Sequence, residues 1–215
     1  MTRGEMTTRV QQWLGLQQMD DYNEVPLVQD MLYRGVVDLL ARTRCVVRCV
    51  HLHTQANVSV YTLDHSLLSL VDVEDGATRR ARRDQNLTPT FTLIRSDILR
   101  LNPTPDAAGV VDVWAVLRPQ KMAVDGDSPG DENYGAIPEE FQDAIELYAC
   151  WRCADYNDDQ SSQQGERYRM LYEGQDGRGG RLREIRMMVN KRGTARAANR
   201  RVTLAELADR RTYVG

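Results

Sequence analysis

Four cysteines and three histidines are the side chains of this 215-residue chain best suited to metal or redox chemistry. The cysteines form two pairs far apart in the chain, Cys45 with Cys49 and Cys150 with Cys153. A redox Cys-x-x-Cys pair sits at the start of a helix, where the helix dipole lowers the pKa of one thiol. Cys150 and Cys153 fall in the middle of a predicted helix, which favours buried free thiols over the alternatives of a zinc site or redox pair.

His51 and His53 alternate on one face of a predicted strand. Two histidines at this spacing can bind a metal ion, but no carboxylate or cysteine spacing close by completes a known site. We therefore expect a polar outer face of the sheet, with no metal and no cofactor. The chain also lacks the phosphate-binding, zinc-protease and serine-hydrolase motifs, so we predict that it is not an enzyme.

The charge of the chain is unevenly distributed. The total of 28 Lys and Arg against 31 Asp and Glu gives a net charge of −3. From residue 178 to the end there are 11 basic and 3 acidic residues, or +8, so the preceding residues carry 17 − 28 = −11. An acidic body with a basic tail predicts an acidic partner, either a nucleic acid or a protein surface. The Arg79–Arg83 run is expected in a loop between strands, where it could touch phosphates, face solvent or contact another subunit.

Apolar periodicity predicts helices near 6–14, 24–42, 137–156 and 162–189. The first should be capped by Thr7 and Thr8 and end near Gly15, and the last should break at the glycine-rich stretch 174–180. These helices can close into one four-helix bundle. Its predicted core consists of Val28, Leu32, Val36, Leu39, Phe141, Ile145, Tyr148, Tyr168 and Leu171.

Between the second and third helices, the apolar period changes from 3.6 to 2, which predicts an inserted β-domain. Strands are expected at 46–52, 58–63, 71–73, 91–94 and 110–117, and the loop 54–57 suits a hairpin between the first two. The predicted fold class is α+β: a four-helix bundle, an inserted antiparallel sandwich or barrel-like domain, and an extended basic C-terminal arm.

The predicted domains follow from these changes of pattern. The helical bundle comprises 1–44 and 136–189, the β-domain 45–124, the linker loop 125–135 and the arm 190–215. No apolar run approaches the length of a membrane span and no signal peptide begins the chain, so we expect a soluble protein made in the cytoplasm.

Several helical segments resemble the head-to-tail adaptor proteins of tailed bacteriophages. The segment Ile137–Ile145, followed by Tyr148-Ala149, Gly165–Tyr168 and Leu171–Glu173, is similar to the third and fourth helices of that family. Val25–Arg42 is similar to its early helix, and Val189–Gly193 resembles the end of its last helix before an extended tail. The resemblance covers roughly 6–43 and 137–193, and the order of the elements carries most of it.

The resemblance implies a structural protein of the virion neck, made in the cytoplasm of a bacterial host. Such adaptors form rings, commonly of twelve subunits, that dock under the portal protein and extend the channel through which genomic DNA leaves. Their other face receives a stopper, tail-tube or tail-hub protein. The portal-binding arm would use Asn190, Lys191, Arg192, Arg196, Arg200, Arg201, Arg210 and Arg211. The alternative is a nucleic-acid-binding regulatory protein that uses the same basic tail.

Overall fold

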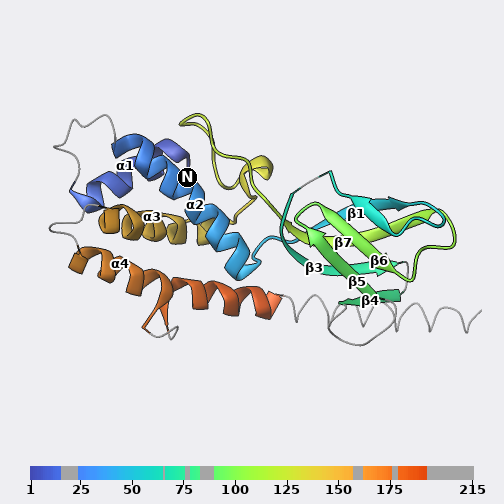
Figure 1. Cartoon of the computed structure of the whole chain (residues 1–215). Helices are drawn as coiled ribbons and strands as arrows, with labels where there is room; N and C mark the ends of the chain where they lie inside the picture. Colours follow the sequence, from blue (N-terminus) through green and yellow to red (C-terminus); the bar gives the residue numbers. More distant parts are fainter. Residues whose placement is uncertain are drawn as a thin grey trace, which may run out of the picture.

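The protein is a mixed α/β chain, and its computed structural model describes residues 1–15, 24–64, 66–75, 78–82, 90–156, 162–175 and 179–192. The helices gather at one end of an elongated molecule and the strands at the other (Figure 1). Among the described helices, none is both long and apolar enough to cross a membrane.

The first helix, α1 (Arg3–Leu14), begins earlier than its sequence pattern predicts. Thr2 is the N-cap: its hydroxyl accepts a hydrogen bond from the Glu5 amide, and the Glu5 carboxylate accepts one from the Thr2 amide. This reciprocal capping box satisfies two amides that the helix leaves unpaired. The expected cap at Thr7 and Thr8 is wrong, because both hydroxyls donate to carbonyls one turn earlier inside the helix. The helix ends at Gly15 as expected, with a left-handed φ of 72°.

The next helices pack closely against each other. α2 (Glu24–Thr43) contacts α3 (Asp143–Tyr156), which follows two short 3-10 turns, η3 (Glu132–Tyr134) and η4 (Glu139–Phe141). A Cβ atom on Gly35 of α2 would lie 3.2 Å from side-chain atoms of Ile145 and Tyr148 in α3. The small residue therefore sets how closely these two helices approach.

The fourth helix is interrupted where the glycines predicted a break. α4 (Ser162–Glu173) is followed, after a short excursion, by a helical segment at 180–192 that continues in nearly the same direction (Figure 1). Gly180 closes the base of this excursion: its φ is +71°, and a Cβ there would lie 2.3 Å from the Gly174 nitrogen. Residues 190–192 are helical, so the described part of this helix runs three residues past its predicted end at 189.

Seven strands form the other end of the molecule: β1 (Arg48–Thr54), β2 (Val60–Thr62), β3 (Leu67–Asp75), β4 (Thr78–Arg82), β5 (Thr90–Arg95), β6 (Ile98–Asn102) and β7 (Gly109–Leu117). Their order is β1-β7-β3-β4-β5-β6-β2, and all pairs are antiparallel except β4–β5. Strands from both halves of this order, β7 and β3 as well as β5 and β6, contribute to one buried cluster, which includes Val73, Phe91, Leu99 and Val113. β1 and β2 are the outer strands of this order, so the described strands do not close into a barrel.

Three details of the β-region differ from the sequence expectations. The predicted hairpin between the first two strands is wrong, because β1 pairs with β7 and β2 pairs with β6. β6 was not expected, although Leu99 and Leu101 alternate with exposed residues as a half-buried strand requires. Arg79–Arg82 lie in β4 rather than in a loop, and Arg83 lies outside the described residues.

The helices have a separate apolar cluster, and the structure places the predicted core residues around it. Val28, Leu32, Val36, Leu39, Phe141 and Ile145 are buried, while Tyr148 and Tyr168 are partly buried and pack against the cluster. Leu171 departs from the expectation, since it is 48% exposed and its neighbour Tyr172 is fully buried instead. The helix rotates by 100° per residue, so a one-residue error in phase moves a side chain from core to surface.

Glu146 of α3 is an exception in this apolar surrounding, because its carboxyl group is buried. Its Oε1 has no hydrogen-bond partner in the part of the chain that the structure describes, and the Arg9 guanidinium lies 3.7 Å away. Burial raises the pKa of Glu146, and the Arg9 charge only partly opposes this. Folding therefore shifts the Glu146 carboxyl group toward its neutral form.

We expect Glu146→Gln to stabilise the protein more at higher pH. The stability associated with a raised carboxyl pKa is complete below the ordinary value of 4.5 and is lost as pH rises through the folded-state value. The glutamine variant cannot ionise and escapes this loss. Its free energy of unfolding minus that of wild type, measured in urea, should be greater at about pH 8 than at about pH 4. An equal difference at both pH values would contradict the expectation.

Candidate functional site

The structure describes the first three residues of the predicted portal-binding arm. Asn190, Lys191 and Arg192 form the end of the helical segment 180–192. Arg196, Arg200, Arg201, Arg210 and Arg211 lie outside the described residues, so their part in the arm stays a prediction. The site is therefore built from the contacts that hold segment 180–192.

Arg192 is attached to the 3-10 turn η4, which precedes α3. Its Nη2 lies 2.6 Å from the Glu140 carboxylate, and its guanidinium carbon lies 5.7 Å from the centre of the Phe141 ring. The ion pair is about half exposed and contributes little by itself, on the order of 1 kcal/mol or less. Together with the ring contact, it holds Arg192 against η4.

Arg181 attaches the beginning of the same segment to α3. Its guanidinium contacts the Asp143 carboxylate at 2.9 Å and the Glu184 carboxylate at 2.8 Å, and donates to the Glu140 carbonyl oxygen. The Arg181 side chain is 21% exposed. Burial, the largest single influence, acts to lower its pKa, but the two carboxylates together outweigh it, so the pKa of Arg181 is raised. Arg181 and Arg192 thus attach segment 180–192 to η4 and the first residue of α3.

The C-terminal end of α2 contacts both α4 and segment 180–192. Tyr172 of α4 is fully buried, and its hydroxyl donates to the Asp38 carboxylate at 2.6 Å. Burial, then the Asp38 charge, raises the pKa of Tyr172, so the hydroxyl stays protonated. Arg42 pairs with Glu173, and Arg186 donates to the Arg42 carbonyl oxygen at 3.0 Å. The two halves of the fourth helix are therefore attached to the same end of α2.

Three large apolar side chains are exposed on these two helical pieces. Met170 and Leu171 of α4 are 44% and 48% exposed, and Met187 of segment 180–192 is 50% exposed. Single exposed apolar side chains are common on protein surfaces, although they also supply area for contact with another chain.

The cysteine pairs do not form a common site. Cys150 and Cys153 are buried free thiols inside α3, as the sequence favours, while Cys45 and Cys49 are only partly buried. Burial raises the pKa of Cys150, with Cys153 and Glu146 as smaller contributions, so the reactive thiolate is disfavoured. Cys49 lies on the outer face of the sheet beside His51, and Asp112 of β7 joins them there. Sequence reasoning missed Asp112, because only the β1–β7 pairing brings it to this place.

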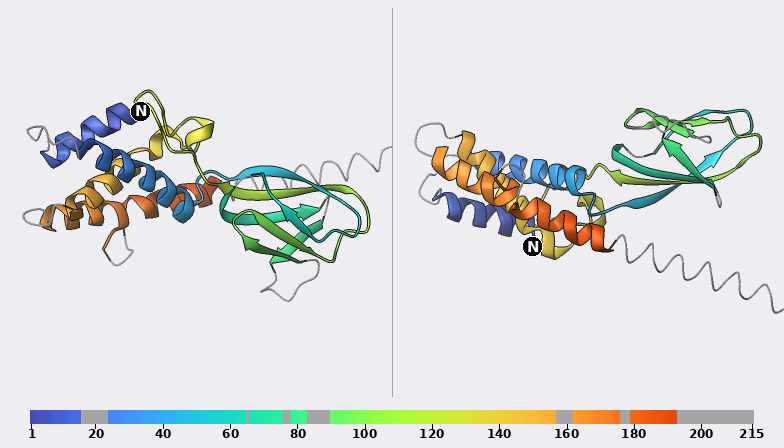
Figure 2. Two further views of the ribbon diagram at one scale, coloured as in Figure 1. Left: turned by 45° about the horizontal axis from the view of Figure 1, so that its top comes forward. Right: turned by 90° about the horizontal axis from the view of Figure 1, so that it is seen from below.

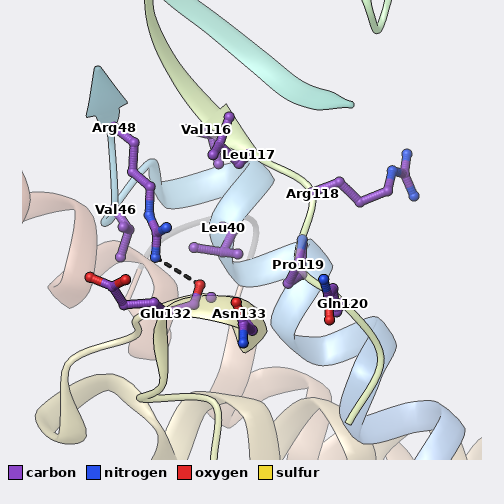
Figure 3. Close-up of a pocket in the computed structure, with 11 residues that line it drawn as sticks. Leu40, Val46, Arg48, Val116, Leu117, Arg118, Pro119, Gln120, Glu132 and Asn133 are labelled. Carbon is purple, nitrogen blue, oxygen red and sulfur yellow. Dashed lines mark hydrogen bonds between the residues drawn. The ribbon is translucent and has the colours of Figure 1, made fainter. Parts of the chain in front are cut away.

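The junction of helices and strands contains a small cavity (Figure 3). It measures about 110 Å³ and lies between Leu40 of α2, Val116 near the end of β7 and Asn133 of η3. Arg48 reaches across it and donates to the Glu132 carbonyl oxygen at 2.7 Å. Ligand pockets usually measure about 300–1,000 Å³, so this space suits a few water molecules rather than a substrate.

Several contacts make this junction well packed. Val116 belongs to the helical cluster, and Leu68 and Val71 of β3 pack against it. Arg3 of α1 pairs with Asp125 at 2.6 Å and donates to the Met122 carbonyl oxygen, which attaches the chain after β7 to α1. Two views of the molecule show the strands continuing from the end of α2 (Figure 2). The β-region is therefore packed against the helices rather than only tethered to them.

Comparison with known proteins gives one match. A family model described as SU10 adaptor protein matches residues 1–205, which covers the helices, the β-region and most of the basic tail. A search of curated proteins finds no match to the chain.

Proposed function

Because this chain belongs to the SU10 adaptor protein family of phage head-to-tail adaptors, we propose that it is a structural component of the virion neck. In this proposal, twelve copies form a ring that docks under the portal protein and extends the DNA channel. The opposite face of the ring is the platform for a stopper, tail-tube or tail-hub protein. The protein acts through assembly and performs no catalysis.

The proposed portal contact is made by the arm 190–215. The observation that carries this proposal is the way the arm begins: Arg192 is attached to Glu140 and Phe141, so each subunit would direct its arm the same way. Residues 193–215 contain five arginines against Glu206 and Asp209, which suits an acidic surface on the portal. In a ring, equally directed arms would engage the portal together, and multivalency strengthens such binding.

The proposed ring contact includes the exposed side chains of Met170, Leu171 and Met187. A closed ring needs two different surfaces on each subunit, which meet by a repeated rotation. These side chains supply apolar area for one of these surfaces, on α4, which Tyr172 attaches to α2, and on segment 180–192, which Arg181 attaches to α3. Burial of such side chains between subunits is favourable, at roughly 25 cal/mol per Å².

The charge of the body supports a channel for DNA in transit. Residues 1–177 carry a net charge of −11, and acidic walls repel phosphates, whereas basic walls would retain the genome. In this proposal DNA passes without sequence-specific binding. The bundle is assigned to 1–44 and 136–189, the β-domain to 45–124, and the linker loop to 125–135.

The experiment that tests this function mixes the purified full-length protein with purified portal rings of the same phage. Native mass spectrometry should find twelve subunits bound to each portal ring. A gel shift with duplex DNA at low salt examines the alternative, a nucleic-acid-binding regulator. Failure to bind portal rings, together with tight salt-dependent DNA binding, would overturn the adaptor function in favour of that regulator.

A further inference from the structure

Three side chains of different metal-binding types meet on the outer face of the β-region. The Cys49 sulfur, a His51 ring nitrogen and an Asp112 carboxylate oxygen all lie within 4.8 Å of one another. Cys49 is partly buried, while the His51 and Asp112 side chains are 67% and 41% exposed. The group is therefore accessible from solvent.

Strand pairing explains why these side chains converge. His51 of β1 lies directly opposite Asp112 of β7, and Cys49 precedes His51 by two residues on the same face of β1. Directly opposite side chains on antiparallel strands lie about 5 Å apart at Cβ, within reach of a shared ion. Since β7 is a central strand between β1 and β3, the backbone that presents Asp112 is held on both sides.

The Asp112 carboxylate is already in contact with the His51 ring. His51 Nδ1 lies 2.7 Å from Asp112 Oδ1, and the Cys49 sulfur lies within 4.8 Å of both groups. Glu74 of β3 lies opposite Asp112 on its other side and accepts a hydrogen bond from the Trp114 indole at 3.3 Å. A cation bound beside Cys49 and His51 would therefore lie near two neighbouring carboxylates, those of Asp112 and Glu74.

We propose that Cys49, His51 and Asp112 bind one zinc ion, with water as the fourth ligand. Thiolate, imidazole and carboxylate are the three side-chain ligands of zinc, and a thiolate disfavours magnesium and calcium. On binding, the Cys49 thiol releases its proton to solvent. His51 coordinates through Nδ1 and carries its ring proton on Nε2.

Side-chain rotation would have to adjust the observed geometry to accept the ion. Tetrahedral zinc places nitrogen and oxygen ligand atoms about 3.4 Å apart and a sulfur ligand about 3.6 Å from each of them. The His51–Asp112 contact of 2.7 Å would widen by roughly 0.7 Å, and the Cys49 sulfur, which lies within 4.8 Å of both groups, would take up its place at about 3.6 Å from them. The ion would join the outer strand β1 to the central strand β7. This proposal does not depend on the adaptor function.

Isothermal titration of the reduced full-length protein with zinc chloride tests the site. We expect saturable binding of one zinc ion per chain, weakened at least tenfold in Cys49→Ser and in Asp112→Asn. His53→Gln and Cys45→Ser are matched controls, since they remove the same side-chain types outside the group, and they should bind zinc like the wild type. Cobalt should give a thiolate-to-metal absorption band that disappears in Cys49→Ser.

Two results would overturn the proposal. One is the absence of saturable zinc binding to the wild-type protein. The other is equal weakening by the control variants, which would mean that zinc binds elsewhere. Circular dichroism of each variant establishes that it is folded, so that lost binding reports on the ligand. The wild-type zinc titration needs no variant at all.

Discussion

A chain that ends at Arg192 is expected to fold and assemble like the full-length protein but to lose its attachment to the portal. The truncation removes only 193–215 and retains the contacts of Arg192 with Glu140 and Phe141. If two or more anchoring side chains lie in the arm, affinity should fall by about 100-fold or more, or about 2.8 kcal/mol. Co-sedimentation with portal rings measures the loss, and urea unfolding measures the stability, which should be unchanged.

A second variant separates a specific docking arm from a simple positive charge. It carries residues 193–215 in scrambled order, so length, composition and net charge are those of the natural arm. Specific docking predicts that the scrambled chain binds the portal as weakly as the truncated chain. Equal portal binding by the truncated and full-length chains would show that the arm is not the docking element. Full portal binding by the scrambled chain would show that the arm binds through its net charge and not through a specific order of side chains.

Tyr172→Ala is expected to be the most destabilising single substitution among the helices that hold the arm. The side chain is fully buried, and its ring centre lies 5.5 Å from that of Tyr148 and 6.3 Å from that of Trp151. Removing a large buried aromatic costs about 3–5 kcal/mol through lost burial and the cavity left behind. Urea unfolding at a fixed protein concentration should therefore show a strongly lowered free energy of unfolding.

Two matched substitutions divide this effect into its parts. Tyr172→Phe keeps the ring but removes the hydroxyl that donates to the Asp38 carboxylate, which retains the Arg42 guanidinium at 3.6 Å, and should cost about 1.5–3 kcal/mol. Tyr156→Ala removes the same side chain at the end of α3, where the residue is 71% exposed, and should change stability by less than about 0.5 kcal/mol. If Tyr156→Ala destabilised the protein as much as Tyr172→Ala, burial would not be the cause.

The helices could be predicted because their signals are local. The apolar spacing of three and four residues around Val28, Leu32 and Val36 marks one face of α2, and Gly15 marks the end of α1. Which face of α4 is buried could not be predicted as well, because Leu171 and Tyr172 are both apolar enough for the core and only packing selects between them. The N-cap of α1 at Thr2 also has a signal in the sequence, because Glu5 three residues later completes a capping box.

Strand pairing could not be predicted in the same way. Residues 48–54 and 60–62 both have strand composition, and a short loop between strands suggests a hairpin. The structure instead pairs β1 with β7, which lies more than fifty residues later, and β2 with β6. Pairing is decided by which apolar faces fill the common cluster around Val113 and Leu99, and no short window of sequence contains that information.

The amino-acid sequence by itself determined the helical frame, the place of the β-region between the second and third helices, and the separation of charge into an acidic body and a basic arm. These properties depend on residue type and on neighbours a few positions away. Only the tertiary structure decided which distant groups meet: Arg192 with Glu140, Tyr172 with Asp38, and Asp112 with Cys49 and His51. Such meetings depend on the packing of whole elements, because contacts between distant residues form only when their helices and strands are brought together.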